Sequence, residues 1–164
     1  MIEQHLYAIA DITSKNHPKR CVVFLISDDR RITAKDEFDK LAITTERHFR
    51  ARFDAWVDGQ INKKMFHGWD QSEFGGNYTN CFVFKCKENK KQRRLYGFLC
   101  HPKVSDNRYQ ICVLVSHAFK NEHETHETYL KIIEQFSTLP DVLEAIKDFF
   151  KEKNDGKSLD KPKH

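Results

Sequence analysis

No apolar stretch of this sequence approaches the roughly 20 residues that a membrane-spanning helix needs. The start of the chain, MIEQHLYAIADIT, carries an acidic residue early and has no basic segment ahead of an apolar one, so a secretory signal peptide is not expected. Internal repeats and low-complexity tracts are also missing. The length of 164 residues then predicts one domain over residues 1–153, followed by a charged, disordered tail at residues 154–164.

Cysteine pairs spaced for metal binding are absent as well. The five cysteines are odd in number and include no Cys-x-x-Cys pair; they are Cys21, Cys81, Cys86, Cys100 and Cys112. Most lie among apolar residues, where a free cysteine behaves as a small hydrophobic side chain. A zinc site shared with nearby histidines is the alternative, but the spacings match no standard zinc pattern. We therefore expect a protein of the reducing cytoplasm with no cofactor and no metal.

Positive charge is only slightly in excess in this sequence. The net charge is +4, while charged residues make up 32% and hydrophobic residues 39% of the chain. A case for nucleic-acid binding must therefore depend on where the charge is concentrated. Residues 85–94 hold six basic residues and one acidic residue, and the candidates for RNA contact are Lys85, Lys87, Lys90, Lys91 and Arg93. A solvated hairpin loop is the alternative interpretation of this run.

Short apolar runs predict four strands. They occupy residues 21–27 (CVVFLIS), 81–86, 95–100 and 109–119. The polar residues 87–92 predict a hairpin loop, and Pro102 marks a turn before the last strand. Residues 1–20 have little pattern, so the sequence does not decide whether they join the sheet or form a separate arm.

Helical spacing of apolar residues occurs in two parts of the chain. The first predicts one amphipathic helix, or two helices with a break near residues 43–45; its stripe consists of Phe38, Leu41, Thr45, Phe49, Phe53 and Trp56. Thr33 followed by Asp36 resembles an N-terminal capping box, and Gly59 stands where a helix would stop. A second helical region follows the last strand, and Pro140 begins another helix within it.

The order of these elements indicates the fold class. One strand is followed by helices, a strand hairpin, a long strand and further helices. Consecutive strands joined by short loops form antiparallel pairs. We therefore predict an α+β fold in which an antiparallel or mixed twisted sheet packs against the N-terminal helices, with additional C-terminal helices. We expect the helices to lie beside one face of the sheet.

Cationic and imidazole side chains mark the ends of two neighbouring predicted strands. Arg94 opens one strand, and His117 and Lys120 close the next. RNA cleavage through the 2′-hydroxyl needs a base at that oxygen, a cation facing the phosphate and a proton donor for the leaving oxygen. Histidine, with an ordinary pKa of about 6.5, suits either proton role, and arginine presents a planar fork to phosphate oxygens. These residues are therefore candidates for catalysis.

Strand alternation alone does not bring the three candidates together. His117 shares a face with Val113 and Val115, whereas Lys120 falls just past the opposite face. Their convergence with Arg94 requires a twist or a bulge at the strand ends. Each side chain also has a structural interpretation, His117 as a hydrogen-bonded core residue and Lys120 as a surface lysine.

These residues belong to a longer pattern. The segment RRLYGFL, a turn, and RYQICVLVSHAFKNEHETHETYLKII resemble the C-terminal half of RelE/HigB-type toxins, including the phage Gp49-like branch, and the similarity covers about residues 35–137. The shared element is an arginine that opens one strand and a strand that ends in His-x-Phe-Lys, here residues 117–120. The resemblance implies a RelE-like fold, a compact sheet against two N-terminal helices. It also implies a protein that cuts mRNA, mostly on the ribosome, without a metal, and that a cognate antitoxin silences.

The resemblance assigns roles by position. Arg94 and Lys120 would bind phosphate, and Lys85 matches the basic residue of the first hairpin strand; the cleavage chemistry leaves His117 or His123 to move protons. The lysine-rich run that usually follows Phe-Lys is here Asn-Glu-His-Glu, which puts negative charge beside the site. Two hypotheses follow: a metal-independent mRNA endoribonuclease of a toxin–antitoxin pair, or a non-catalytic RelE-fold protein that binds RNA or a protein partner.

Overall fold

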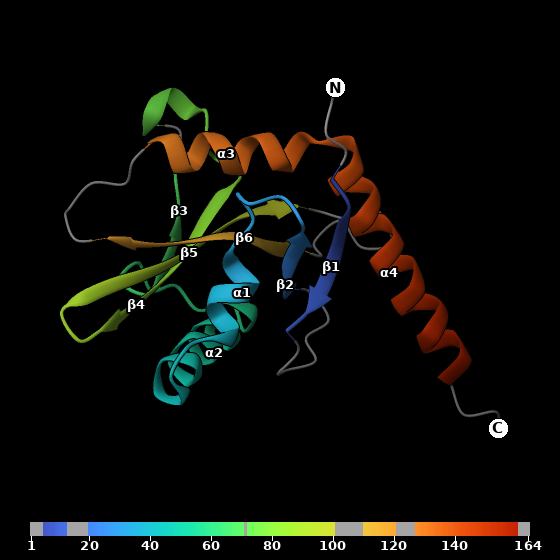
Figure 1. Cartoon of the computed structure of the whole chain (residues 1–164), viewed down its shortest axis with the longest axis horizontal. Coiled ribbons are helices and arrows are strands. Elements are labelled where there is room, and N and C mark those ends of the chain that lie inside the picture. The colour runs from blue at the N-terminus through green and yellow to red at the C-terminus, as the bar shows by residue number, and fades with distance from the viewer. Residues whose placement is uncertain (1–4, 13–19, 71, 101–109, 121–126, 161–164) are drawn as a thin grey trace.

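The computed structural model of the chain (Figure 1) contains six strands and four helices in the residues that it describes, which are 5–12, 20–70, 72–100, 110–120 and 127–160. For Lys120 and residues 152–160 it describes the backbone alone. The strands are β1 (Tyr7–Asp11), β2 (Arg20–Ser27), β3 (Phe66–Gly68), β4 (Cys81–Glu88), β5 (Lys91–Cys100) and β6 (Gln110–Lys120). The helices are α1 (Ala34–Asp39), α2 (Ile43–Val57), α3 (Glu127–Thr138) and α4 (Pro140–Asp160), and a 3-10 turn, η1, spans Phe74–Gly76.

The described strands form one mixed sheet in the order β1-β2-β6-β5-β4-β3. Neighbours run antiparallel, except that β2 and β6 are parallel. The predicted α+β class with a mixed sheet is therefore confirmed. Residues 7–11 join the sheet as an edge strand, which decides a question that the sequence left open. The opposite edge is β3, in a segment where the sequence predicted no strand.

The two pairs of helices cover opposite faces of the sheet. The first is the α1/α2 face, where α1 and α2 contribute buried residues that include Phe38 and Trp56. The second is the α3/α4 face, where α3 and α4 contribute residues that include Leu130 and Val142. The prediction that the helices lie beside one face is therefore wrong. A sheet whose two faces are both apolar needs a helical layer on each.

Strand β2 illustrates why both faces need cover. Val22 and Phe24 belong to the core of the α1/α2 face, whereas Val23 and Leu25 belong to the core of the α3/α4 face. Side chains alternate between the faces of a strand, so a continuous apolar run is what a strand buried on both faces requires.

A β-bulge interrupts the pairing of β5 with β6. Tyr96 pairs with Ser116, but Gly97 pairs with Leu114, so Val115 has no partner on β5. One extra residue in a strand reverses the face on which all the following side chains lie.

This bulge determines the position of His117. His117 pairs with Leu95, whose side chain lies in the core of the α1/α2 face, and paired residues of antiparallel strands share a face. Strand alternation predicted His117 on the same face as Val115, which belongs to the core of the α3/α4 face. That prediction is wrong because the bulge shifts the alternation by one residue.

Thr33, which precedes α1, forms hydrogen bonds with two backbone groups of β6 at the bulge. Its amide N–H donates to the carbonyl oxygen of Val115 at 3.0 Å, and its Oγ1 accepts from the backbone N–H of His117 at 2.9 Å. The side chain makes no cap hydrogen bond with α1, so the predicted capping box is wrong. Thr33 instead ties the start of α1 to β6.

The helix ends follow the sequence signals in part. Two helices, α1 and α2, replace the single-helix alternative, and the break lies at residues 40–42. Gly59 follows α2 with φ of 86°, which confirms the predicted stop. Helix α4 continues to Asp160, into residues that the sequence assigned to a tail. This part of the helix was not predicted because the apolar stripe ends at Phe150 and leaves no periodic signal beyond it. None of the described helices is long and apolar enough to cross a membrane.

The β4–β5 hairpin is tighter than predicted. Strand pairing continues to Glu88 opposite Lys91, so only two residues form the turn, and one of them, Asn89, has a positive φ of 55°. Most of the predicted loop at 87–92 is therefore strand. Its basic side chains alternate between the two faces of the sheet instead of sharing one loop.

Candidate functional site

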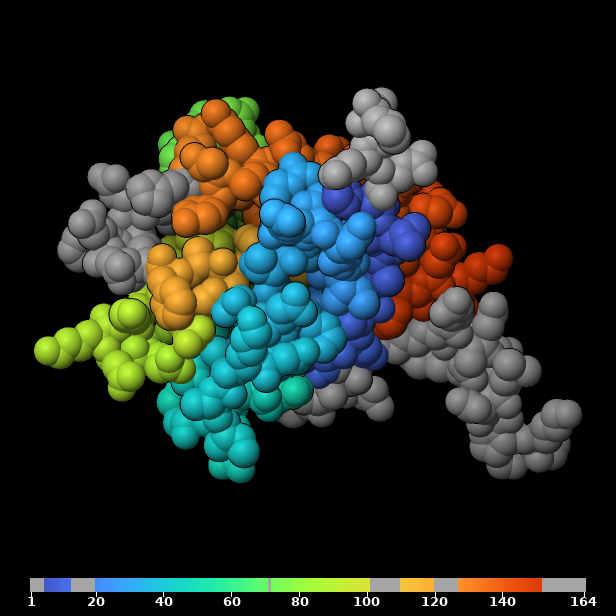
Figure 2. Space-filling model, in the orientation of Figure 1, coloured from blue at the N-terminus to red at the C-terminus, as the bar shows by residue number. Residues whose placement is uncertain are grey.

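Charged and aromatic side chains gather at the end of β5 and β6 on the α1/α2 face. The strand register places Arg93 opposite Phe119, next to the pair of Leu95 and His117. Figure 2 shows the hairpin tip (yellow-green) projecting from the body beside β6 (gold) and α2 (teal). We call the set Glu88, Lys91, Arg93, His117 and Phe119 the strand-end cluster.

Arg93 lies at the centre of this cluster. Its Nη1 donates to Nε2 of His117 at 3.2 Å, and its Nε and Nη2 lie 3.1 and 3.0 Å from Oε1 of Glu88. The other carboxylate oxygen of Glu88 accepts a hydrogen bond from the hydroxyl of Thr45 in α2. Helix α2 thus orients the carboxylate, which in turn orients the guanidinium toward His117.

The pKa values of the cluster follow from these contacts. Burial, and then the charge of Arg93, lower the pKa of His117, while Glu37 and Glu88 oppose the shift. His117 is therefore largely neutral at pH 7. A guanidinium can only donate, so Nε2 of His117 is the acceptor and the ring proton is on Nδ1. Hydrogen bonds from Thr45 and Arg93 lower the pKa of Glu88, which keeps this carboxylate charged.

Phe119 presents an aromatic ring to solvent within the cluster. It is 46% exposed, and its ring lies 5.0 Å from the imidazole of His117 in an edge-to-face arrangement. The guanidinium carbon of Arg93 and Nζ of Lys91 lie 4.5 and 5.5 Å from the ring centroid. An exposed ring with cations beside it is what a single-stranded nucleic acid uses for base stacking and phosphate contact.

The structure places Arg94 on the other face of the sheet. Arg94 pairs with Ala118, which packs against the core of the α3/α4 face. The Arg94 residue is only 7% exposed, and its Nη2 donates to Oε1 of Gln92 at 3.0 Å. Arg94 and His117 therefore lie on opposite faces, and the convergence considered from the sequence does not occur.

The remaining sequence candidates are spread over the hairpin. Lys85 pairs with Arg94, and its Nζ donates to the carbonyl oxygen of Lys63 at 2.9 Å. Burial, and then the charge of Arg94, lower the pKa of Lys85. Three further lysines are exposed, namely Lys87, Lys90 and Lys91. The backbone of Lys120 pairs with Gln92, whereas His123 lies outside the described residues.

Glu88 and Phe119 were not predicted as site residues from the sequence. From the sequence, Glu88 was only the single acid in a basic run, and Phe119 only the aromatic residue of the His-x-Phe-Lys element, with no role of its own. The available signal was the short polar stretch before Arg93, since a two-residue turn brings positions 88 and 93 to one end of the hairpin. The assumption of a six-residue loop concealed that register.

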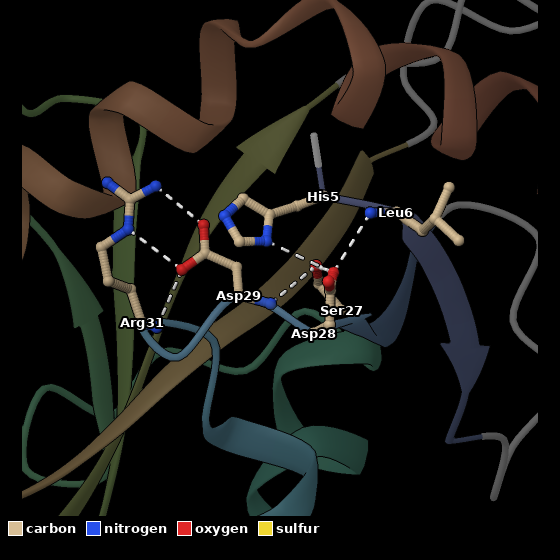
Figure 3. Close-up of polar contacts among 6 residues, drawn as sticks. All are labelled: His5, Leu6, Ser27, Asp28, Asp29 and Arg31. Atoms are coloured by element: carbon tan, nitrogen blue, oxygen red, sulfur yellow. Dashed lines mark hydrogen bonds and ion pairs between the residues drawn. The ribbon is translucent and has the colours of Figure 1, made fainter. Parts of the chain in front are cut away.

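A second group of polar side chains holds the loop between β2 and α1 (Figure 3). Asp29 is 5% exposed and accepts three hydrogen bonds from Arg31, from the amide N–H at 3.0 Å, from Nε at 3.1 Å and from Nη2 at 2.8 Å. The guanidinium carbon of Arg31 lies 4.7 Å from the ring centroid of Phe136 in α3. Nδ1 of His5 lies 3.4 Å from Asp28. This group anchors the loop to α3, which is a structural role.

Replacing Asp29 with asparagine is expected to lower the free energy of unfolding at pH 7 by about 1–3 kcal/mol, because a nearly buried acceptor loses its charged hydrogen bonds. Contacts with Arg31 lower the pKa of Asp29 below its ordinary 3.8. Its stabilisation is therefore present above that value and lost as the pH falls through the lowered pKa. Urea unfolding at pH 7 and pH 3 measures both effects.

The control for Asp29 is Asp39→Asn in α1, because Asp39 forms an exposed i,i+4 pair with Lys35. This control should change stability by less than about 0.5 kcal/mol. An Asp29→Asn deficit that is the same at pH 7 and pH 3 would contradict the assigned role of the carboxylate charge.

Within the part of the chain that the structure describes, no group of three or more His, Cys, Asp or Glu side chains is arranged to hold a metal ion. In comparisons with known proteins, no family model, no curated protein and no solved structure matches this chain.

Proposed function

We propose that this protein is a toxin-like mRNA endoribonuclease that cleaves the phosphodiester through the 2′-hydroxyl without a metal. One observation carries the proposal: a neutral histidine, His117, lies against an exposed aromatic ring, Phe119, and the cations of Lys91 and Arg93 lie near the same ring. A base stacked on Phe119 would bring its 3′-phosphate toward Lys91 and its 2′-hydroxyl toward His117.

The chemistry divides among the residues of the strand-end cluster. His117 accepts the 2′-hydroxyl proton at Nε2, which becomes available when Arg93 turns toward the bound phosphate. The contact of 3.2 Å between Arg93 and His117 is at the long end for a hydrogen bond, which favours this exchange. Lys91 and Arg93 stabilise the charge that grows on the phosphate oxygens. The proposed role of Lys120, phosphate binding, rests on the sequence resemblance. That of His123, proton transfer to the leaving 5′-oxygen, rests on the chemistry of cleavage.

The arrangement of the sheet supports a RelE-like interpretation. That resemblance implies a compact sheet against two N-terminal helices, and α1 and α2 pack in this way on the face that carries the strand-end cluster. The partners that follow from it are mRNA, on or off the ribosome, and a cognate antitoxin protein. Strands β1 and β3 and the α3/α4 layer extend this unit.

A second candidate function is RNA binding without cleavage. It is favoured by the contacts that Arg93 already makes with Glu88, His117 and Phe119, which leave its side chain only 16% exposed. A cation held this firmly positions its neighbours more readily than it rearranges around a phosphate.

Incubation of a 5′-labelled mRNA with the purified protein in EDTA, with and without ribosomes, separates the two functions. A metal-independent nuclease should release fragments with 2′,3′-cyclic phosphate and 5′-hydroxyl ends. Absence of cleavage by folded protein under both conditions would exclude the nuclease and leave the binding function, which gel-shift titration would then measure.

Phe119→Ala should weaken the binding of a short single-stranded RNA by about tenfold, since stacking of one base contributes about 1–3 kcal/mol. Fluorescence anisotropy of a labelled oligonucleotide measures the change. Phe74→Ala is the matched control, because Phe74 is a similarly exposed ring, 37% against 46%, in η1. Equal losses from the two variants would contradict the proposed stacking on Phe119.

A further inference from the structure

A groove of about 650 Å³ lies along the β3 edge of the sheet, between β3, the end of α2 and the segment that joins them. Its volume is in the range of pockets that hold small organic ligands. None of the residues of the strand-end cluster lines it. The groove is therefore separate from the surface proposed to bind an RNA strand.

The walls of this groove are aromatic. Trp56 and Trp69, the two tryptophans of the chain, both line it, and both are nearly buried. Trp69 stacks on Tyr96 with ring centroids 6.3 Å apart, which fixes the orientation of its indole. Ile61 also lines the groove and is 88% exposed. Trp56 belongs to the core of the α1/α2 face and Trp69 to that of the α3/α4 face, so one flat ring can rest against only one of them. Trp69 lies beside His67, with ring centroids 5.1 Å apart.

Cationic groups stand around the same space. The guanidinium of Arg20 lies 4.8 Å from the ring centroid of Trp56, and its Nη1 donates to the Trp56 carbonyl oxygen at 2.7 Å. Lys63 and Lys85 line the groove as well, and Nζ of Lys85 is held on the Lys63 carbonyl oxygen at 2.9 Å. Burial and the nearby Arg94 lower the pKa of Lys85, so an anion beside this ammonium would relieve an unfavourable environment.

His67 adds a hydrogen-bond acceptor that could bind the edge of a nucleotide base. Its Nδ1 lies 2.9 Å from the carbonyl oxygen of Gly68, which can only accept, so Nδ1 carries the proton. Burial, and the charges of Lys85 and Arg94, lower the pKa of His67 despite that hydrogen bond. The ring is therefore largely neutral at pH 7, and its Nε2 is an acceptor for an N–H group.

Two acids, Asp70 and Glu73, also line the groove. Asp70 accepts hydrogen bonds from the backbone and hydroxyl of Ser72, and Glu73 accepts from the Asp70 backbone N–H at 3.3 Å. These carboxylates accept hydrogen bonds from residues of their own turn. The phosphate of a ligand would therefore lie beside Lys63 and Lys85 instead of at that turn.

We propose that this groove binds a nucleoside monophosphate, with the base against Trp69 and His67 and the phosphate beside Lys63 and Lys85. A flat ring and an anionic group together match the two kinds of surface that the groove offers. Binding of the mononucleotide does not depend on cleavage of RNA, because the two sites use different residues.

Intrinsic fluorescence tests this directly, since both tryptophans of the protein line the groove. The full chain is titrated with adenosine 5′-monophosphate and uridine 5′-monophosphate, and in parallel with adenosine and with inorganic phosphate. At least one nucleotide should change the emission saturably. Adenosine should bind at least tenfold more weakly than its monophosphate, and phosphate alone should leave the emission unchanged.

Variants of the cations complete the test. Lys85→Met and Lys63→Met should each weaken nucleotide binding at least fivefold, whereas Lys64→Met, an exposed neighbour that does not line the groove, should change it less than twofold. Circular dichroism verifies that each variant is folded. No saturable change with either nucleotide, binding of phosphate as tight as that of the nucleotide, or equal effects at Lys64 and Lys85 would each overturn the proposal. RNA cleavage by a protein that fails this test would leave the proposed nuclease function intact.

Discussion

Gly97→Ala should destabilise the protein by about 3 kcal/mol or more, a large part of the about 5–15 kcal/mol by which a folded domain is stable. A Cβ added at Gly97 would lie 2.2 Å from the carbonyl oxygen of Val113 and 2.8 Å from its carbonyl carbon. Both atoms belong to the backbone of β6, so the clash is relieved only if β5 and β6 separate. Those two strands form the centre of the sheet, where no such shift is tolerated.

Urea unfolding followed by circular dichroism measures this effect. Gly59→Ala is the matched control, because Gly59 has a positive φ of 86° but no atom within 4 Å of an added Cβ. It should cost about 1 kcal/mol, from backbone conformation alone. If the two variants lost equal stability, close packing at the bulge would not be the reason for the glycine.

His117→Gln should reduce RNA cleavage by about 100-fold or more while leaving the fold intact. General-base catalysis contributes about 100-fold to 10,000-fold to a rate, and glutamine retains a polar side chain of similar size without the titrating ring. Initial rates on a labelled mRNA in EDTA give the comparison. His48→Gln, on the exposed surface of α2, is the control and should retain the full rate. A rate unchanged in His117→Gln would exclude this residue as the base.

The pH dependence of cleavage separates a base from a structural residue. A base acts in its unprotonated form, and burial and Arg93 lower the pKa of His117 below its ordinary 6.5, so activity should persist as the pH falls through 6.5. Arg93→Gln removes one of the two causes and should move the acidic limb of the profile to higher pH. An acidic limb that stays in place would show that His117 does not set it.

Much of the fold was readable from the residues. The apolar run of β2, the helical stripe from Phe38 to Trp56 and the helix stop at Gly59 all appear where local pattern predicts them. These signals are local, because strand and helix periodicity record which side chains one element must bury. The basic character of the β4–β5 hairpin could also be predicted, because a run of basic residues is a property of one local segment.

Tertiary structure alone decided which of those residues act together. The sequence predicted His117 on the face of Val115, and one unpaired residue in β6 moved it to the opposite face, beside Arg93 and away from Arg94. A bulge depends on the register between two strands, on the lack of a side chain at Gly97 and on the contact of Thr33 with β6. These are relations between distant parts of the chain, so the spacing of residues within one strand cannot contain them.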